Sequence, residues 1–141
     1  MIVGKSVEEL SIGQKSVFEK TISESDVYLF AGITGDLNPA HINQRQAEQT
    51  VFKGRIAHGI LVTGLISNVL AMQLPGPGTI YISQQVKFLA PVHIGDTVRA
   101  EVEVIDINLG KNRVTLRTCC YKQDDVQVIE GEAIVSPPPK K

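Results

Sequence analysis

The chain has 141 residues, with 14 Lys and Arg against 15 Asp and Glu and a net charge of −1. This length corresponds to one ordinary domain, and a hydrophobic fraction of 43% excludes a disordered chain. The even charge balance argues against a nucleic-acid-binding protein, which needs a basic face. We expect a single domain over residues 1–135, followed by a flexible Pro-rich tail over residues 136–141.

The first half of the chain predicts a strand followed by short helical segments. Residues 14–22 have the pattern of a strand, and Ser-Glu-Ser-Asp at 23–26 is a capping box that begins a short helix. That helix is expected to end near Gly32. Residues 35–43 are rich in turn formers, and a further short helix is expected over residues 44–50.

The second half predicts one long helix and then four strands. Residues 59–74 are apolar on nearly every side, which indicates a helix in the middle of a core. Later segments alternate between apolar and polar residues, as strands do. These segments are residues 79–89, 97–106, 113–122 and 126–135. The apolar set changes parity between Val128 and Ile129, which predicts a β-bulge.

This order predicts an α+β hot-dog fold, in which an antiparallel β-sheet is wrapped around a long central apolar helix. The turns between the strands are too short for parallel crossovers. A single curled sheet has an exposed edge, so we expect a homodimer or higher homo-oligomer that joins sheets edge to edge.

The cysteine pattern and the apolar segments predict the compartment. Cys119 and Cys120 are neighbours in a predicted strand, so their side chains point to opposite faces and cannot bridge each other. We interpret them as reduced thiols of a cytoplasmic protein. Residues 1–10 lack the apolar run of a signal peptide, and residues 59–74 are shorter than the roughly 20 residues of a membrane span, so no membrane association is expected.

Asp36 and His41 are the candidates for acid–base chemistry. Asn38-Pro39 lies between them and predicts a turn that folds the carboxylate and the imidazole toward one point. Such a pair can act on one water molecule. The alternative is that Asp36 caps a turn and His41 packs. We expect no metal, because no third ligand is spaced nearby.

Gly59 directly precedes the apolar helix and is a candidate oxyanion hole. Helix N-termini carry unpaired N–H groups, and glycine lets a carbonyl oxygen approach them closely. A purely structural glycine is the alternative. Ser67 places a hydroxyl inside the same helix, where it either faces a site or bonds back to a carbonyl one turn earlier. His93 is expected to be an exposed loop histidine.

These residues form a pattern that resembles a known family. The sequence Thr-Gly-Asp-Leu-Asn-Pro-Ala-His at 34–41, with His-Gly at 58–59 before the long helix, resembles the hydratase motif of MaoC-like (R)-specific enoyl-CoA hydratases. Ala40 departs from the larger aliphatic residue that is usual there. The resemblance extends over about residues 13–135 and raises the weight of the catalytic interpretation of Asp36 and His41.

The resemblance implies a hot-dog homodimer that hydrates trans-2-enoyl-CoA reversibly to (R)-3-hydroxyacyl-CoA. Asp36 and His41 would activate the water and move the proton, the Gly59 N–H would bind the thioester oxygen, and no metal or cofactor would be needed. Polar support from Asn38 and Ser67 is a weaker implication. The partner is an acyl-CoA thioester, and its chain length is not implied. Two alternatives are an acyl-CoA thioesterase and a non-catalytic acyl-CoA-binding module.

Overall fold

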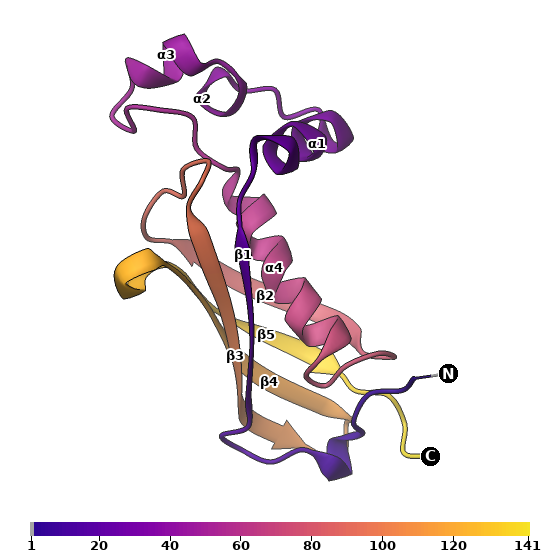
Figure 1. The fold of residues 1–141 in the computed structure, drawn as a ribbon. Helices are drawn as coiled ribbons and strands as arrows, with labels where there is room; N and C mark the ends of the chain where they lie inside the picture. The colour runs from indigo at the N-terminus through magenta and orange to yellow at the C-terminus, as the bar shows by residue number, and fades with distance from the viewer. Residues whose placement is uncertain (1) are drawn as a thin grey trace.

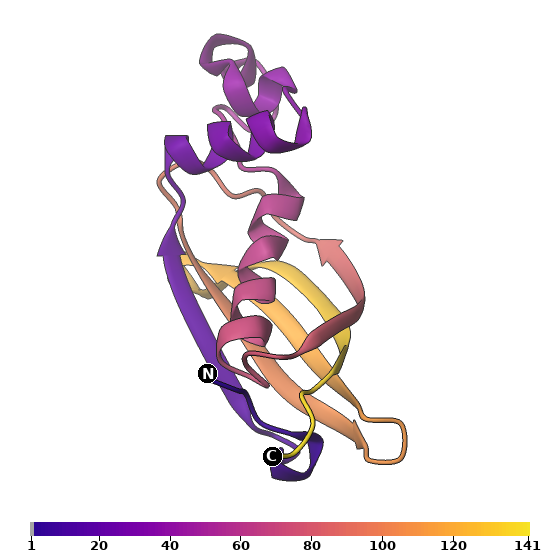
Figure 2. The same ribbon diagram turned by 90° about the vertical axis from the view of Figure 1, so that its right-hand side faces the viewer.

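The computed structural model describes residues 2–141. A five-stranded antiparallel sheet has the order β1-β3-β4-β5-β2, and a long helix, α4, crosses one face of it (Figures 1 and 2). The strands are β1 (Lys15–Thr21), β2 (Ile80–Phe88), β3 (Thr97–Asn108), β4 (Arg113–Lys122) and β5 (Val126–Ser136). The helices are α1 (Glu24–Thr34), α2 (Pro39–Ile42), α3 (Gln44–Glu48) and α4 (Gly59–Met72), with 3₁₀ turns at Val7–Glu9 and Gln123–Asp125. This architecture confirms the predicted α+β hot-dog fold.

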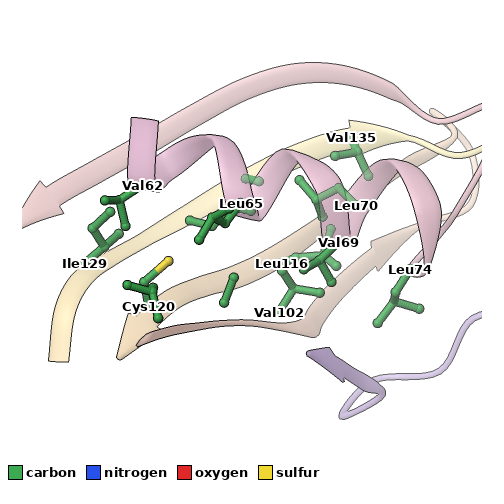
Figure 3. Packing of buried hydrophobic residues seen from close by; sticks show 14 of the residues in the cluster. Val62, Leu65, Val69, Leu70, Leu74, Val102, Leu116, Cys120, Ile129 and Val135 are labelled. Carbon is green, nitrogen blue, oxygen red and sulfur yellow. The ribbon is translucent and has the colours of Figure 1, made fainter. Parts of the chain in front are cut away.

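The core forms between the inner face of the sheet and one side of α4. Along β3, alternate residues Val98, Ala100, Val102 and Val104 are all fully buried, as period-two burial requires. The buried residues of α4 are Val62, Leu65, Ile66, Val69 and Leu70. Figure 3 shows Leu65, Val69 and Leu70 directed at the side chains of the sheet.

One part of the prediction for α4 is wrong. The helix is not enclosed on all sides, because Ile60 and Met72 are 59% and 64% exposed on its outer side. The apolar sequence of this helix therefore leaves apolar surface uncovered in the single chain.

The β-bulge predicted in β5 is confirmed. Cys120 pairs with Ile129 and the next residue, Tyr121, pairs with Gln127, which leaves Val128 without a partner on β4. Val128 and Ile129 are each 1% exposed, so both neighbours are buried although alternation would expose one of them. The bulge bends β5 as it curves around α4.

The chain near its C-terminus packs onto the sheet. Strand β5 extends to Ser136, and Pro137 and Pro138 are buried. The side-chain amide of Asn112 donates hydrogen bonds to Ser136 Oγ and Pro137 O. The predicted domain boundary at Val135 thus lies inside a strand.

Helices α1, α2 and α3 lie together beyond one end of the sheet, at the N-terminal end of α4 (Figure 1). The predicted capping box begins α1: Ser23 Oγ accepts from Asp26 N at 3.1 Å, and Asp26 Oδ2 accepts from Ser23 N at 2.9 Å. This helix passes the expected end at Gly32 and stops at Gly35, whose φ of 80° suits glycine. None of the helices within residues 2–141 has the length and apolarity that a membrane crossing requires.

Candidate active site

Asp36 is held in a tight loop just after α1. Its backbone N–H donates to Thr34 Oγ1 at 3.2 Å, and its Oδ1 accepts from Asn38 N at 3.3 Å. Asp36 therefore does cap a turn, as the alternative proposed. Its side chain is 51% exposed and Oδ2 is not engaged in the turn, so one carboxylate oxygen still faces the neighbouring histidines.

His41 is positioned by a short helix where the sequence predicted a turn. Asn38 caps α2 by accepting from Ala40 N at 3.0 Å, and Pro39 occupies the first helical position, where its missing N–H costs nothing. His41 Nδ1 lies 2.7 Å from Ile56 O. Because a carbonyl oxygen only accepts, Nδ1 carries the proton and Nε2 has the free lone pair.

The structure brings Asp36 and His41 together and adds a third residue, His58. One carboxylate oxygen of Asp36 and one ring nitrogen from each histidine all lie within 4.8 Å of one another. A single water molecule can hydrogen-bond to both Asp36 and His41 across such a distance. Two groups on one water can remove one proton and deliver another, which is the geometry that acid–base catalysis requires.

His58 is the site residue to which the sequence analysis gave no role. It is 17 positions after His41, and only its place before an apolar helix marked it. The statement that no third ligand lies near the pair is thus wrong. His58 Nε2, which is 3.9 Å from Asp36 Oδ2, is a poor metal ligand, because it donates to Asp36 O at 2.9 Å and cannot also offer a lone pair.

Gly59 begins α4, and its N–H makes no hydrogen bond within residues 2–141. The space that glycine leaves is occupied by the ring of Phe88: a Cβ on Gly59 would be 2.5 Å from Phe88 Cε1. Beside them is an apolar cavity of about 450 Å³. Its lining includes Phe52, Ile60, Leu89 and Val128.

Ser67 and His93 lie elsewhere. Ser67 is eight residues along α4 from Gly59, about 12 Å by helical rise, and lines a groove with Tyr81 and Gln84 of β2. The exposed position predicted for His93 is wrong, because its ring is half-buried and its Nε2 contacts Phe52 O at 2.6 Å. This bond ties the loop before α4 to the loop between β2 and β3.

Arg55 connects the helices that surround the dyad. Its guanidinium donates to Glu24, to Tyr28 Oη at 2.8 Å and to Gln44 Oε1 at 2.8 Å, so one side chain joins α1, α3 and the loop before α4. The hydrogen bond to Glu24 keeps the pKa of Arg55 above its ordinary value. Tyr28 in turn donates to Ile42 O at 3.0 Å, at the end of α2.

The fold is a hot-dog domain, because a curled antiparallel sheet wraps around one helix. A carboxylate and an imidazole at the N-terminus of that helix give it an acid–base site. Residues 8–123 match the family described as MaoC like domain, and the chain belongs to this family. It is 56% identical over 131 residues to an (R)-specific enoyl-CoA hydratase from Rhodospirillum rubrum, covering 93% of this chain and 90% of that protein.

Two further relatives agree with this family. A 3-hydroxybutyryl-CoA dehydratase from Methylorubrum extorquens is 48% identical, covering 95% of this chain and 85% of that protein. The solved structure of the unliganded R-hydratase PhaJ1 from Pseudomonas aeruginosa is 43% identical, with a TM-score of 0.93, covering 99% of this chain and 89% of that one.

Proposed function

We propose that this protein is an (R)-specific enoyl-CoA hydratase, a hydro-lyase that adds water reversibly to trans-2-enoyl-CoA to give (R)-3-hydroxyacyl-CoA. The observation that carries the proposal is the Asp36–His41 pair, whose carboxylate and imidazole lie within 4.8 Å at the N-terminal end of α4. The relatives named hydratase and dehydratase support the same reaction, since the two names describe its two directions.

The proposed reaction follows from the tautomer of His41 and the closeness of Asp36 to it. Asp36 and the Nε2 lone pair of His41 hold one water molecule and take a proton from it as its oxygen bonds to the β-carbon. The electron pair of the double bond moves toward the thioester, so negative charge develops on the carbonyl oxygen. The Gly59 N–H stabilises this charge, and the proton is returned to the α-carbon.

The substrate is proposed to be an acyl-CoA thioester whose carbonyl lies at Gly59. The adjacent apolar cavity of about 450 Å³ is large enough for a short acyl group and offers it no charged side chain. No step of this reaction transfers electrons to or from a carrier, so we propose that it uses no redox cofactor. We also propose that the Gly59 N–H polarises the carbonyl, so that no metal is needed there.

The first test is turnover of crotonyl-CoA, followed by the loss of its conjugated absorbance, with chiral analysis of the product. A thiol reagent in the same assay detects free CoA and so separates hydration from thioester hydrolysis. An (R)-3-hydroxy product without CoA release supports the proposal. Release of CoA would favour the thioesterase, and binding without turnover would favour the non-catalytic module.

The second test changes the dyad. Asp36→Asn and His41→Ala should each lower kcat by about 10²–10⁴-fold while the protein stays folded. The double variant should lose far less than the product of the two effects, because both groups act on one water. Asp124→Asn is the matched control: it is exposed in the turn before β5, and its φ of 63° is tolerated by asparagine. A folded, fully active Asp36→Asn protein would disprove the mechanism.

The functional unit is proposed to be a homodimer formed through β2 in the cytoplasm. β1 and β2 are the two edges of the sheet. The β1 edge carries Lys15 and Lys20, which discourage pairing. β2 has one lysine, Lys87, and β1 has one exposed large apolar residue, Val17. More exposed apolar side chains lie on β2 and the outer side of α4, namely Ile80, Tyr81, Ile82, Phe88, Ile60 and Met72. The two buried free thiols suit a reducing compartment.

Light scattering should therefore give twice the chain mass of 15.3 kDa. Ile82→Lys places a charge on the β2 edge and should dissociate the dimer. Leu109→Lys, at an exposed position in the β3–β4 turn, should leave the dimer intact. An active wild-type monomer would contradict this proposal.

A further inference from the structure

His58 is a buried polar residue whose hydrogen bonding fixes its tautomer. The side chain is 3% exposed, and Nε2 lies 2.9 Å from Asp36 O. The carbonyl only accepts, so Nε2 bears the proton. The other nitrogen, Nδ1, is buried and has no hydrogen-bond partner in the described part of the chain. Buried polar atoms without partners are uncommon and costly, so this ring is a place to look for a role beyond packing.

His58 also contacts both members of the dyad. Its ring stacks on His41, with centroids 3.8 Å apart and planes inclined by 26°. The ring of Phe30 lies 4.6 Å away. The Nε2 atom of His58 is hydrogen-bonded to Asp36 O and also lies 3.9 Å from Asp36 Oδ2. One side chain therefore sets the plane of the imidazole and the place of the carboxylate.

The backbone of His58 adds a third connection. His58 is the N-cap of α4, and the next residue is Gly59, whose N–H is the proposed oxyanion donor. A ring that holds Asp36 and His41 therefore also fixes their distance from the proposed oxyanion donor. Errors of 1 Å in such distances can cost about 10²-fold in rate.

We propose that His58 is a positioning residue for the hydration reaction: its Nε2–H holds Asp36, its ring orients His41, and its backbone fixes Gly59 relative to both. This inference rests on the proposed function. His58 does not itself exchange protons with the substrate, because its Nε2–H is already donated to the Asp36 carbonyl.

Two variants separate the contributions of the ring and the donor. His58→Phe keeps an aromatic ring against His41 but loses the donor to Asp36 O. His58→Gln keeps an N–H near the position of Nε2 but loses the ring. We expect kcat on crotonyl-CoA to fall about 10²-fold in His58→Phe and less in His58→Gln, with KM changed by less than about threefold in both, because no substrate contact is removed.

His93→Phe is the matched control. His93 is half-buried where His58 is fully buried, and it too contacts a backbone carbonyl through Nε2, that of Phe52. It takes no part in the group formed by Asp36, His41 and His58. Its substitution should lower the free energy of unfolding while kcat stays within about threefold. A comparable loss of kcat in both phenylalanine variants would overturn the proposal, because it would reflect only a lost buried hydrogen bond.

A double-variant cycle provides the decisive activity measurement. In a His41→Ala background, His58→Phe should cause little further loss, because a positioning residue acts through the group that it positions. Independent, multiplicative losses would overturn the proposal. So would a folded His58→Phe enzyme with unchanged kcat, or a wild-type activity that requires zinc, which would make His58 a ligand.

Nitrogen-15 NMR of the histidine rings tests the geometry without any turnover. The wild-type spectrum should show the Nε2–H tautomer for His58, and His58→Phe should shift the ring signals of His41. The Nδ1–H tautomer would overturn the proposal even if no variant folds. If the protein has no hydratase activity but shows these NMR signatures, the proposed function fails while the positioning of Asp36 and His41 by His58 stands.

Discussion

Substitution of Gly59 by alanine should lower the free energy of unfolding when Phe88 is present and raise it when Phe88 is replaced by alanine. A Cβ at Gly59 would lie 2.5 Å from Phe88 Cε1 and 2.7 Å from Cδ1, so the ring must retreat by about 1 Å to restore ordinary contact. Overpacking of this kind costs about 1–3 kcal/mol. Because Phe88 is 53% exposed and can swing toward solvent, we expect a cost near the lower end, about 1–1.5 kcal/mol.

Alanine also restricts the unfolded chain relative to glycine, which stabilises the fold by about 0.4–1 kcal/mol. Gly59→Ala alone should therefore lower the free energy of unfolding by several tenths of a kcal/mol. In a Phe88→Ala background the clash is absent, and Gly59→Ala should raise the free energy of unfolding by about 0.4–1 kcal/mol. The coupling between the two sites should be about 1 kcal/mol or more.

Urea unfolding of the wild type, both single variants and the double variant measures this cycle. All four proteins must be compared at one concentration, because the unfolding of the proposed homodimer would depend on it. A change in midpoint at constant slope reports stability. If Gly59→Ala shifts the midpoint in the same direction and by the same amount in both backgrounds, Phe88 does not occupy the space beside Gly59 and the reasoning fails.

Two further outcomes follow from the hydrogen bonds and burial. Asn38→Ala removes the cap of the four-residue helix α2, a loss of about 1 kcal/mol; kcat should fall, and Asn38→Asp, which still caps, should restore most of it. Burial, and to a lesser extent the neighbouring Cys119, raises the pKa of Cys120 to about 12. Iodoacetamide at about pH 8 should therefore leave Cys120 unmodified until the protein is denatured. Rapid alkylation of the native protein at Cys120, located by mass spectrometry, would contradict this.

The elements that local patterns specify could be predicted from the sequence. The capping box at Ser23, the alternation along β3 and the parity change at Val128 each depend on residues a few positions apart, and each is present in the structure. The start of α1 could be predicted but not its end, because Gly32 tolerates the helix and only Gly35 has the positive φ that stops it.

The site was only partly predictable, for a different physical reason. Asp36 and His41 are close in sequence, and turn formers between them indicated that they meet. His58 joins them through a carbonyl bond and a ring stack that connect segments 17 or more residues apart. His93 is likewise half-buried by a bond to Phe52, 41 residues earlier. No periodicity records such contacts, because they arise only when separate elements pack.

The proposed chemical residues all come from one continuous stretch, Asp36 to Gly59, whose helices α2 and α3 lie beyond the end of the sheet (Figure 1). Arg55 braces this stretch through its hydrogen bonds to α1 and α3. Phe52, Ile56 and Ala57 of this stretch line part of the cavity, and its other walls come from α4, residues 88–92 and β5, which supply none of the dyad. Mutation can therefore reshape those walls, and with them the acyl groups admitted, while the stretch that bears the dyad is inherited unchanged. This separation allows related proteins to differ in the acyl groups they accept while they keep the same catalytic residues.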